Sequence, residues 1–105
     1  METFDFLMNL PNKVNALALE GMNTCFHFDL EGEGGGQVSV IVENGHMISQ
    51  TGLIGTATCV IKAQASDLKK VFKGELNPMM ALLSGKLKIS NQTEMLKFAK
   101  LLGWM

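Results

Sequence analysis

Four stretches of the chain alternate apolar and polar side chains with a period of two, which is the pattern of a half-buried β-strand. They cover residues 23–30, 37–43, 46–51 and 56–63. The clearest turn between them is Asn44-Gly45, a pair that tolerates positive φ and favours a two-residue hairpin. Because the connections are short, we predict that the four strands form an antiparallel meander with one covered face.

Helical periodicity replaces alternation elsewhere. Residues 2–22 carry an apolar pattern that Pro11 interrupts, which leaves open one bent helix or two short ones. Ser66 is a candidate N-cap for a helix ending at Gly74. Residues 86–90 form a short strand with outward lysines, which suits a sheet edge. Asn91 and Glu94 have the spacing of a capping box for a last helix that extends to Leu102.

The most informative segment is Met79-Met80-Ala81-Leu82-Leu83, which is apolar on every helical face. Asn77 is its candidate N-cap, Pro78 fits its first turn, and Gly85 can end it. A helix of this kind must be covered on more than one side. A sheet covers only one side, so we expect a second helix or a non-protein ligand on the other.

Strands and helices that are segregated in this way predict an α+β fold, with helices on one face of a mainly antiparallel sheet. With 105 residues, the chain is the size of one domain, spanning 1–105. It begins METFDF, which lacks the basic start of a signal peptide, and no apolar run reaches the length of a membrane span. A cytoplasmic protein is therefore expected.

Charge is divided unevenly along the chain, although the net charge is only −1. Residues 1–52 carry seven acids and one lysine, whereas residues 53–105 carry three acids and eight lysines. The small net charge argues against a nucleic-acid partner. The basic half offers contacts to an anionic membrane, with a solvated helix surface as the alternative, through Lys69, Lys70, Lys73, Lys97 and Lys100.

Catalytic and metal-binding patterns are missing from the sequence. His27 and His46 have no carboxylate or cysteine at ligand spacing, and no serine lies in a nucleophile motif. Cys25 and Cys59 fit packing residues of a reducing compartment. The glycine-rich residues 31–36 precede a strand instead of a helix, so they predict a hairpin turn and not a phosphate loop. We therefore expect no metal, no cofactor and no enzymatic activity.

The segment Gly74-Glu75-Leu76-Asn77-Pro78, followed by the apolar helix and Gly85-Lys86-Leu87-Lys88-Ile89, resembles the sterol carrier protein type 2 family of lipid-transfer domains. Upstream of this segment, the family's order is also kept by Phe28-Asp29, Asn44-Gly45 and Ala65-Ser66-Asp67-Leu68. The resemblance covers nearly the whole chain and is weakest before Met22. It implies a five-stranded sheet with helices on one face, an apolar tunnel between the layers, and a fatty acid, acyl chain, sterol or isoprenoid as ligand.

Three departures from the family pattern are visible. Gln37-Val38 stands where a tryptophan is common, and Asn91-Gln92 stands where Gly-Asp is usual. The chain ends Gly103-Trp104-Met105 instead of in a peroxisomal address, which fits a free-standing prokaryotic type of member.

Two functions are therefore expected as alternatives. The first is non-catalytic binding or transfer of a lipid. The second is an accessory module that presents a substrate to an enzyme or packs on a partner or on a second copy as a homodimer. For the first, the apolar lining of the tunnel is predicted to comprise Val40, Met47, Ile61, Phe72, Met79, Met80, Leu83, Phe98, Leu102 and Trp104.

Overall fold

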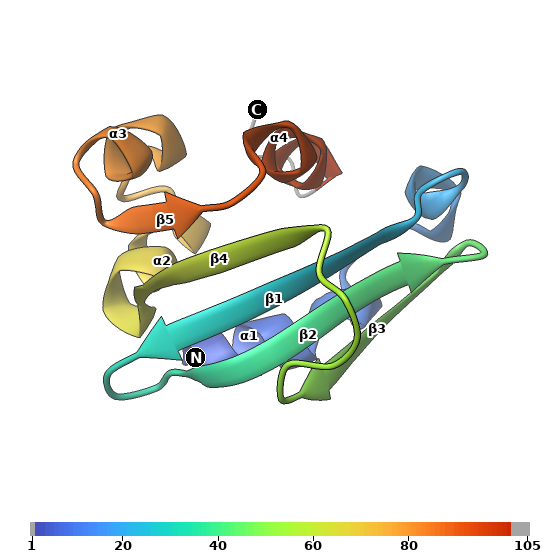
Figure 1. The fold of residues 1–105 in the computed structure, drawn as a ribbon, viewed down its shortest axis with the longest axis horizontal. Helices are drawn as coiled ribbons and strands as arrows, with labels where there is room; N and C mark the ends of the chain where they lie inside the picture. The colour runs from blue at the N-terminus through green and yellow to red at the C-terminus, as the bar shows by residue number, and fades with distance from the viewer. Residues whose placement is uncertain (1, 102–105) are drawn as a thin grey trace.

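The computed structural model describes residues 2–101. It is an α+β fold built on one five-stranded sheet in the order β3-β2-β1-β4-β5, and it confirms the predicted class (Figure 1). The strands are β1 (Thr24–Glu31), β2 (Gly36–Glu43), β3 (His46–Thr51), β4 (Cys59–Gln64) and β5 (Leu87–Ile89).

The described residues also form six short helices. They are α1 (Thr3–Met8), the 3-10 helices η1 (Leu10–Asn12) and η2 (Ala16–Leu19), then α2 (Ala65–Phe72), α3 (Pro78–Leu83) and α4 (Gln92–Leu101). The first three answer the question left open for residues 2–22, since one α-helix is followed by two 3-10 turns. Among the described residues, no helix is long and apolar enough to cross a membrane.

Both predicted hairpins are present. The glycine-rich loop joins β1 to β2, which pair antiparallel from Thr24 opposite Val42. Asn44 and Gly45 join β2 to β3 with φ values of 53° and 77°. Positive φ at both central residues gives the turn the twist that the flanking strands require.

The predicted four-stranded meander is wrong at its last step. β4 does not pair with β3 but lies beside β1 on its other edge, and the two strands run parallel. Residues 52–58 therefore cross β2 and β1 on the sheet face opposite α1 (Figure 1). Seven residues span at most about 23 Å, which suffices for this path.

This crossing segment is held to the sheet by side-chain hydrogen bonds. The buried Ser39 hydroxyl donates to the Gly52 carbonyl at 2.7 Å and accepts from the Ile54 N–H at 2.8 Å. The His27 Nε2 donates to the Ile54 carbonyl at 2.9 Å. His27 thus helps to hold the crossing segment on the sheet.

The core lies between the other face of the sheet and the helices. Alternate residues of β1 and β2, including Phe26, Phe28 and Val40, are fully buried there. The Phe98 ring from α4 stacks on the Phe26 ring with 4.6 Å between centroids. One covered face is therefore confirmed, and the alternation of apolar side chains determines which face it is.

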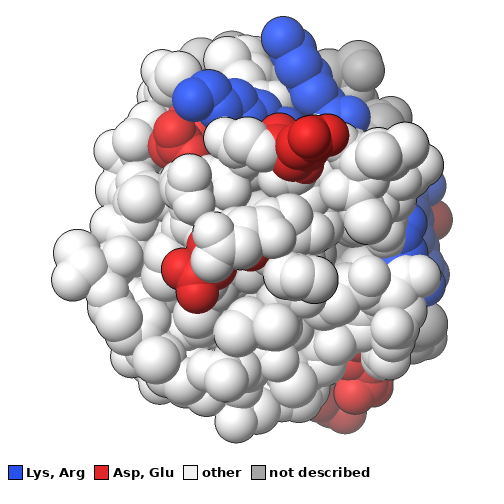
Figure 2. Space-filling model, turned by 90° about the vertical axis from the view of Figure 1, so that its right-hand side faces the viewer, with Lys and Arg blue, Asp and Glu red and all other residues white. Residues whose placement is uncertain are grey.

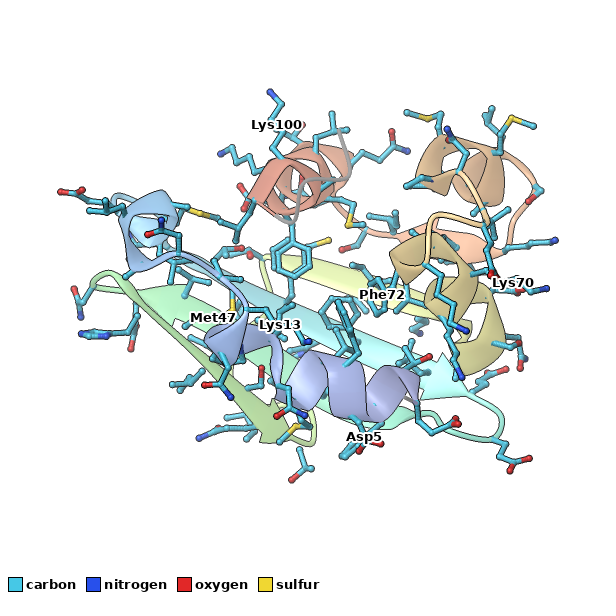
Figure 3. All side chains as sticks on the ribbon, turned by 180° about the vertical axis from the view of Figure 1, so that it is seen from behind. Asp5, Lys13, Met47, Lys70, Phe72 and Lys100 are labelled. Atoms are coloured by element: carbon cyan, nitrogen blue, oxygen red, sulfur yellow. The ribbon has the colours of Figure 1, made fainter. Side chains whose placement is uncertain are left out.

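Helix α1 packs against helix α2. The buried Thr3 hydroxyl donates to the Ala65 carbonyl at 2.6 Å, and the rings of Phe6 and Phe72 stack at 4.2 Å (Figure 3). Ser66 is not the N-cap of α2 as predicted, because the helix already begins at Ala65 and Gln64 is the N-cap residue, without a side-chain bond. Gly74 has φ +76° just past the helix end, as expected of a C-terminal glycine.

Candidate functional site

An apolar groove of about 200 Å³ opens between α3, β5 and α4. Its lining is Asn77, Pro78, Met79, Leu82, Ile89, Gln92, Met95, Leu96 and Ala99. None of these side chains is charged, and the two polar ones are neutral amides. The groove can therefore hold an apolar group without a charge partner.

The α3 wall is shaped by the caps predicted from the sequence. The Asn77 side chain accepts from the N–H groups of Met79 at 2.8 Å and Met80 at 3.3 Å. Pro78 occupies the first turn, and Gly85 follows the helix with φ +80°. These residues confine the helix to six residues, so α3 is a short apolar segment between two fixed ends.

Most of α3's apolar surface is not covered by the described chain. Ala81 is fully buried, whereas Met79 is 50%, Met80 60% and Leu83 76% exposed. The helix packs on β5 with one side only, as the all-round apolar pattern suggested. Exposed apolar area that flanks an apolar groove is typical of a binding surface.

The α4 wall is set by its start. The Asn91 side chain accepts from the Glu94 N–H at 3.2 Å, which confirms it as the N-cap. In the second bond of a capping box, the Glu94 carboxylate would accept from the Asn91 N–H. Here the carboxylate accepts instead from the Thr24 hydroxyl at 3.1 Å and from the Lys97 ammonium at 3.3 Å. The bond from Thr24 joins the start of α4 to β1.

The groove residues of α4 follow one helical stripe, at positions 92, 95, 96 and 99. This spacing repeats one face of a 3.6-residue helix and was visible in the sequence. The same sequence also places Met95, Phe98, Leu101 and Leu102 on one apolar helical face, and that face does not coincide with the groove stripe. The structure divides this face, since Phe98 is in the core while Met95 lines the groove together with Leu96.

The predicted lining residues are distributed between the core and the surface. Met79 lines the groove, and Met80 and Leu83 lie on the exposed side of the same helix. Phe72 is partly buried against Phe6. Leu102 and Trp104 lie outside the described residues. The core contains Val40, Met47, Ile61 and Phe98.

The space between sheet and helices at these core positions is occupied by packed side chains. Phe26, Phe28 and Phe98 have ring centroids 4.6–6.1 Å apart. The predicted tunnel between the layers stays a prediction, and the groove beside β5 is an apolar hollow that the described residues form. The groove also has apolar lining residues that were not among the predicted lining: Pro78, Leu82, Ile89, Met95, Leu96 and Ala99.

The predicted lysines do not form one patch. Lys69 on α2 lies 3.8 Å from the Glu2 carboxylate, and Lys97 on α4 lies 3.3 Å from that of Glu94. Lys70 and Lys100 project from α2 and α4 in different directions (Figure 3). Such exposed ion pairs contribute little to stability, and they leave the lysines available for other contacts.

No group of three or more histidine, cysteine or acidic side chains within residues 2–101 could hold a metal ion. Cys25 and Cys59 are free thiols. Burial raises the pKa of both thiols, which keeps them protonated and poorly nucleophilic at neutral pH.

Comparison with known proteins gives a consistent family. Residues 5–103 match the SCP-2 sterol transfer family. Hydroxysteroid dehydrogenase-like protein 2 of Xenopus tropicalis is 34% identical over 106 residues, which cover 99% of this chain and 25% of that protein. The chain thus spans about a quarter of the length of the curated relatives it matches.

Solved structures share the fold at lower sequence identity. Palmitated sterol carrier protein 2 like 2 of Aedes aegypti has a TM-score of 0.72 and 16% identity, covering 97% of this chain and 95% of that one. A stereoselective inverting sec-alkylsulfatase of Pseudomonas sp. has a TM-score of 0.75 and 16% identity, covering 97% of this chain and 15% of the sulfatase. The same fold therefore occurs both as nearly a whole chain and as a small part of a larger enzyme.

Proposed function

This chain belongs to the SCP-2 sterol transfer family, and from that membership we propose that it binds a lipid-like apolar ligand without altering it chemically. The ligand classes that fit are fatty acids, acyl chains, sterols and isoprenoids. The observation that carries the proposal is the uncharged groove between α3 and α4, beside which α3 exposes apolar side chains.

The chemistry of the groove makes apolar area the main source of affinity. Each buried methylene contributes about 0.8 kcal/mol, so binding strengthens as more of an alkyl chain enters. Asn77 and Gln92 are the polar groups on the lining, and neither carries charge. A ligand therefore gains little from a charged headgroup inside the groove, and its headgroup remains near the solvent.

Thermal unfolding tests this function. A ligand at a free concentration 100-fold above its Kd stabilises a protein by about 2.7 kcal/mol. For a domain of this size that raises Tm on the order of 10 °C. We expect such a shift with at least one member of a panel of long-chain fatty acids, acyl-CoAs, sterols and isoprenoids. A panel that leaves Tm unchanged throughout would contradict the proposal.

A matched pair of variants locates the ligand. Leu96, on the groove, is 39% exposed, and Leu53, in the segment that crosses the opposite sheet face, is 41% exposed. Leu96→Glu places a carboxylate beside the apolar ligand and should abolish most of the Tm shift. Leu53→Glu adds the same charge elsewhere and should keep it. Equal shifts in the two variants would place the ligand outside this groove.

A second candidate function is an accessory module that presents a substrate to an enzyme or packs on a partner. The small share of each larger relative that this chain matches favours this candidate. The matching region is only 25% of a hydroxysteroid dehydrogenase-like protein and 15% of a sulfatase. Native mass spectrometry after gentle purification separates the two candidates. A monomer that retains lipid supports binding and transfer, whereas a lipid-free dimer or a complex with an enzyme supports the module.

A further inference from the structure

The two edges of the sheet differ in how they are protected against pairing with another chain. Natural sheets protect an exposed edge by a very short strand, a lysine, a proline or a β-bulge. β5 is three residues long and carries Lys88. β3, at the opposite edge, is six residues long and contains no lysine, no acid and no proline. Its register with β2 runs from His46 to Thr51 without a bulge, so β3 is the unprotected edge.

The register of the β2–β3 hairpin determines which backbone groups of β3 point away from the sheet. Glu43 and His46 flank the two-residue turn, and a pair in this position exchanges backbone hydrogen bonds. Such pairs recur at every second residue, and the bond from the Gly52 N–H to the Gln37 carbonyl at 2.8 Å continues the same series. The N–H and C=O groups that point outward therefore belong to Met47, Ser49 and Thr51.

The outward backbone groups of these three residues have no hydrogen-bond partner among residues 2–101. The Ser49 hydroxyl donates to the Leu7 carbonyl at 2.7 Å, but this side-chain bond does not involve the Ser49 backbone. In Figure 1, no other strand or helix lies on the outer side of β3. The side of the molecule at which the β2–β3 hairpin ends is mostly uncharged (Figure 2). The edge is thus accessible, and little charge there opposes the approach of a second chain.

We propose that β3 pairs with β3 of a second copy of this chain, antiparallel and related by a two-fold axis at Ser49. In this register Ser49 lies opposite Ser49 of the second copy, and Met47 lies opposite Thr51. Each facing pair exchanges two backbone hydrogen bonds, so the outward groups of both strands satisfy one another. The pairing joins two five-stranded sheets into one continuous sheet. An isologous contact of this kind closes as a dimer and leaves no further β3 edge exposed.

The side chains of β3 fit a second copy as the partner. Ile48 is apolar, yet it is 46% exposed on this edge strand. In the proposed register it lies opposite Gln50 and diagonal to Ile48 of the second copy, at about 7–8 Å, which long side chains can bridge. His46 lies opposite Gly52, which has no side chain to obstruct the approach. Because β3 contains no lysine and no acid, like charges do not meet across the axis, and the edge is its own complement.

The proposed dimer leaves the groove of each copy accessible. The strand order β3-β2-β1-β4-β5 places the groove, which lies beside β5, at the far edge from the paired strands. The pairing therefore uses a different surface from the helices that flank the groove and goes beyond the proposed function. We expect an apolar ligand to leave the dissociation constant of the dimer unchanged. A ligand-induced Tm shift in a chain that stays monomeric would overturn the pairing alone.

Sedimentation equilibrium of the full chain measures the pairing. The mass should rise from that of a monomer toward that of a dimer as concentration increases, and salt should change the dissociation constant less than about twofold, because β3 has no charge to screen. Ile48→Lys places two like charges beside the axis and should weaken the dimer at least about tenfold, with partial recovery at high salt.

Ile54→Lys is the matched control for this substitution. Ile54 is 44% exposed, and its backbone is held over β2 and β1 by Ser39 and His27, away from the β3 edge. The same charge at this position should leave the dissociation constant unchanged. A wild-type chain that is monomeric at every concentration, or equal losses in the two lysine variants, would overturn the proposal.

Cysteine trapping tests the register itself. Residues 48 and 50 of the two copies face each other as a non-bonded pair with Cα atoms about 4.5 Å apart, which a disulfide can bridge. A mixture of the Ile48→Cys and Gln50→Cys proteins in a glutathione buffer should therefore form an intermolecular disulfide. Either variant alone should not, because its introduced thiols lie on diagonal positions about 7–8 Å apart. The natural Cys25 and Cys59 are the same in every sample. No trapping in the mixture, or equal trapping in a single variant, would overturn the two-fold pairing.

Discussion

At the residue scale, burial controls the chemistry of Cys59. Its side chain is fully buried on β4, where the Sγ donates to the Asn91 carbonyl at 3.5 Å. Desolvation disfavours the thiolate and raises the pKa of this thiol above its ordinary value of 9.0, although a hydrogen bond with the Ser90 side chain acts in the opposite direction. The folded protein therefore holds this proton more strongly than the unfolded chain does.

This pKa difference predicts how stability depends on pH. As pH rises through about 9, the unfolded chain loses the Cys59 proton first, so the free energy of unfolding decreases. Below that pH the thiol is protonated in both states and has no such effect. Cys59→Ala should flatten the decline between about pH 8 and 10 in urea unfolding. An unchanged slope in this variant would show that Cys59 does not cause the decline.

At the element scale, the stability of α3 depends on its capped ends more than on the packing of its side chains. It is six residues long, and Ala81 is its buried residue. A helix this short is unstable in isolation, and the Asn77 side chain satisfies two of its N–H groups. The cap therefore holds in place the wall of the proposed lipid site.

Asn77→Ala should lower the free energy of unfolding by about 1 kcal/mol, the usual effect of losing an N-cap. It should also weaken ligand binding, because α3 loses its fixed start. Ser66→Ala is the control, since Ser66 is exposed in α2 and does not cap it. Urea unfolding measures both variants. A loss at Ser66 equal to that at Asn77 would contradict the assigned role of the cap.

At the scale of the whole molecule, Phe98 joins the helical layer to the sheet. Its ring comes from α4, is fully buried, and lies 4.6 Å from the Phe26 ring and 6.0 Å from the Phe28 ring. These contacts connect the last helix to the central strand. They also position the α4 stripe that faces the groove, so core packing and the proposed ligand site depend on the same helix.

Phe98→Ala should destabilise the protein by about 3–5 kcal/mol, because it removes the buried ring and leaves a cavity. Such a loss is a large part of the roughly 5–15 kcal/mol available to a domain. Leu96→Ala, two residues earlier and 39% exposed, should cost far less. Chemical denaturation measures both, and a loss below about 1 kcal/mol at Phe98 would contradict its place in the core.

Local signals in the sequence determined most of the elements. Alternation set the buried faces of β1 and β2, Asn44-Gly45 set one hairpin, and Asn77 and Asn91 set the starts of α3 and α4. Each of these depends on neighbours a few residues away, which is why a linear pattern was enough. The uneven charge was also legible in the sequence, as was the all-round apolar character of residues 79–83.

Only the tertiary structure decided which strand lies beside β1 and where the hollow opens. The position of β4 depends on contacts across more than 30 residues, such as Phe26 opposite Cys59, and the hydrogen bonds of Ser39 and His27 hold the crossing segment in place. The groove likewise exists because α3 and α4 leave a gap beside β5. Periodicity marks a side chain as apolar, but core and groove residues share that property, and three-dimensional packing alone separates Phe98 from Leu96.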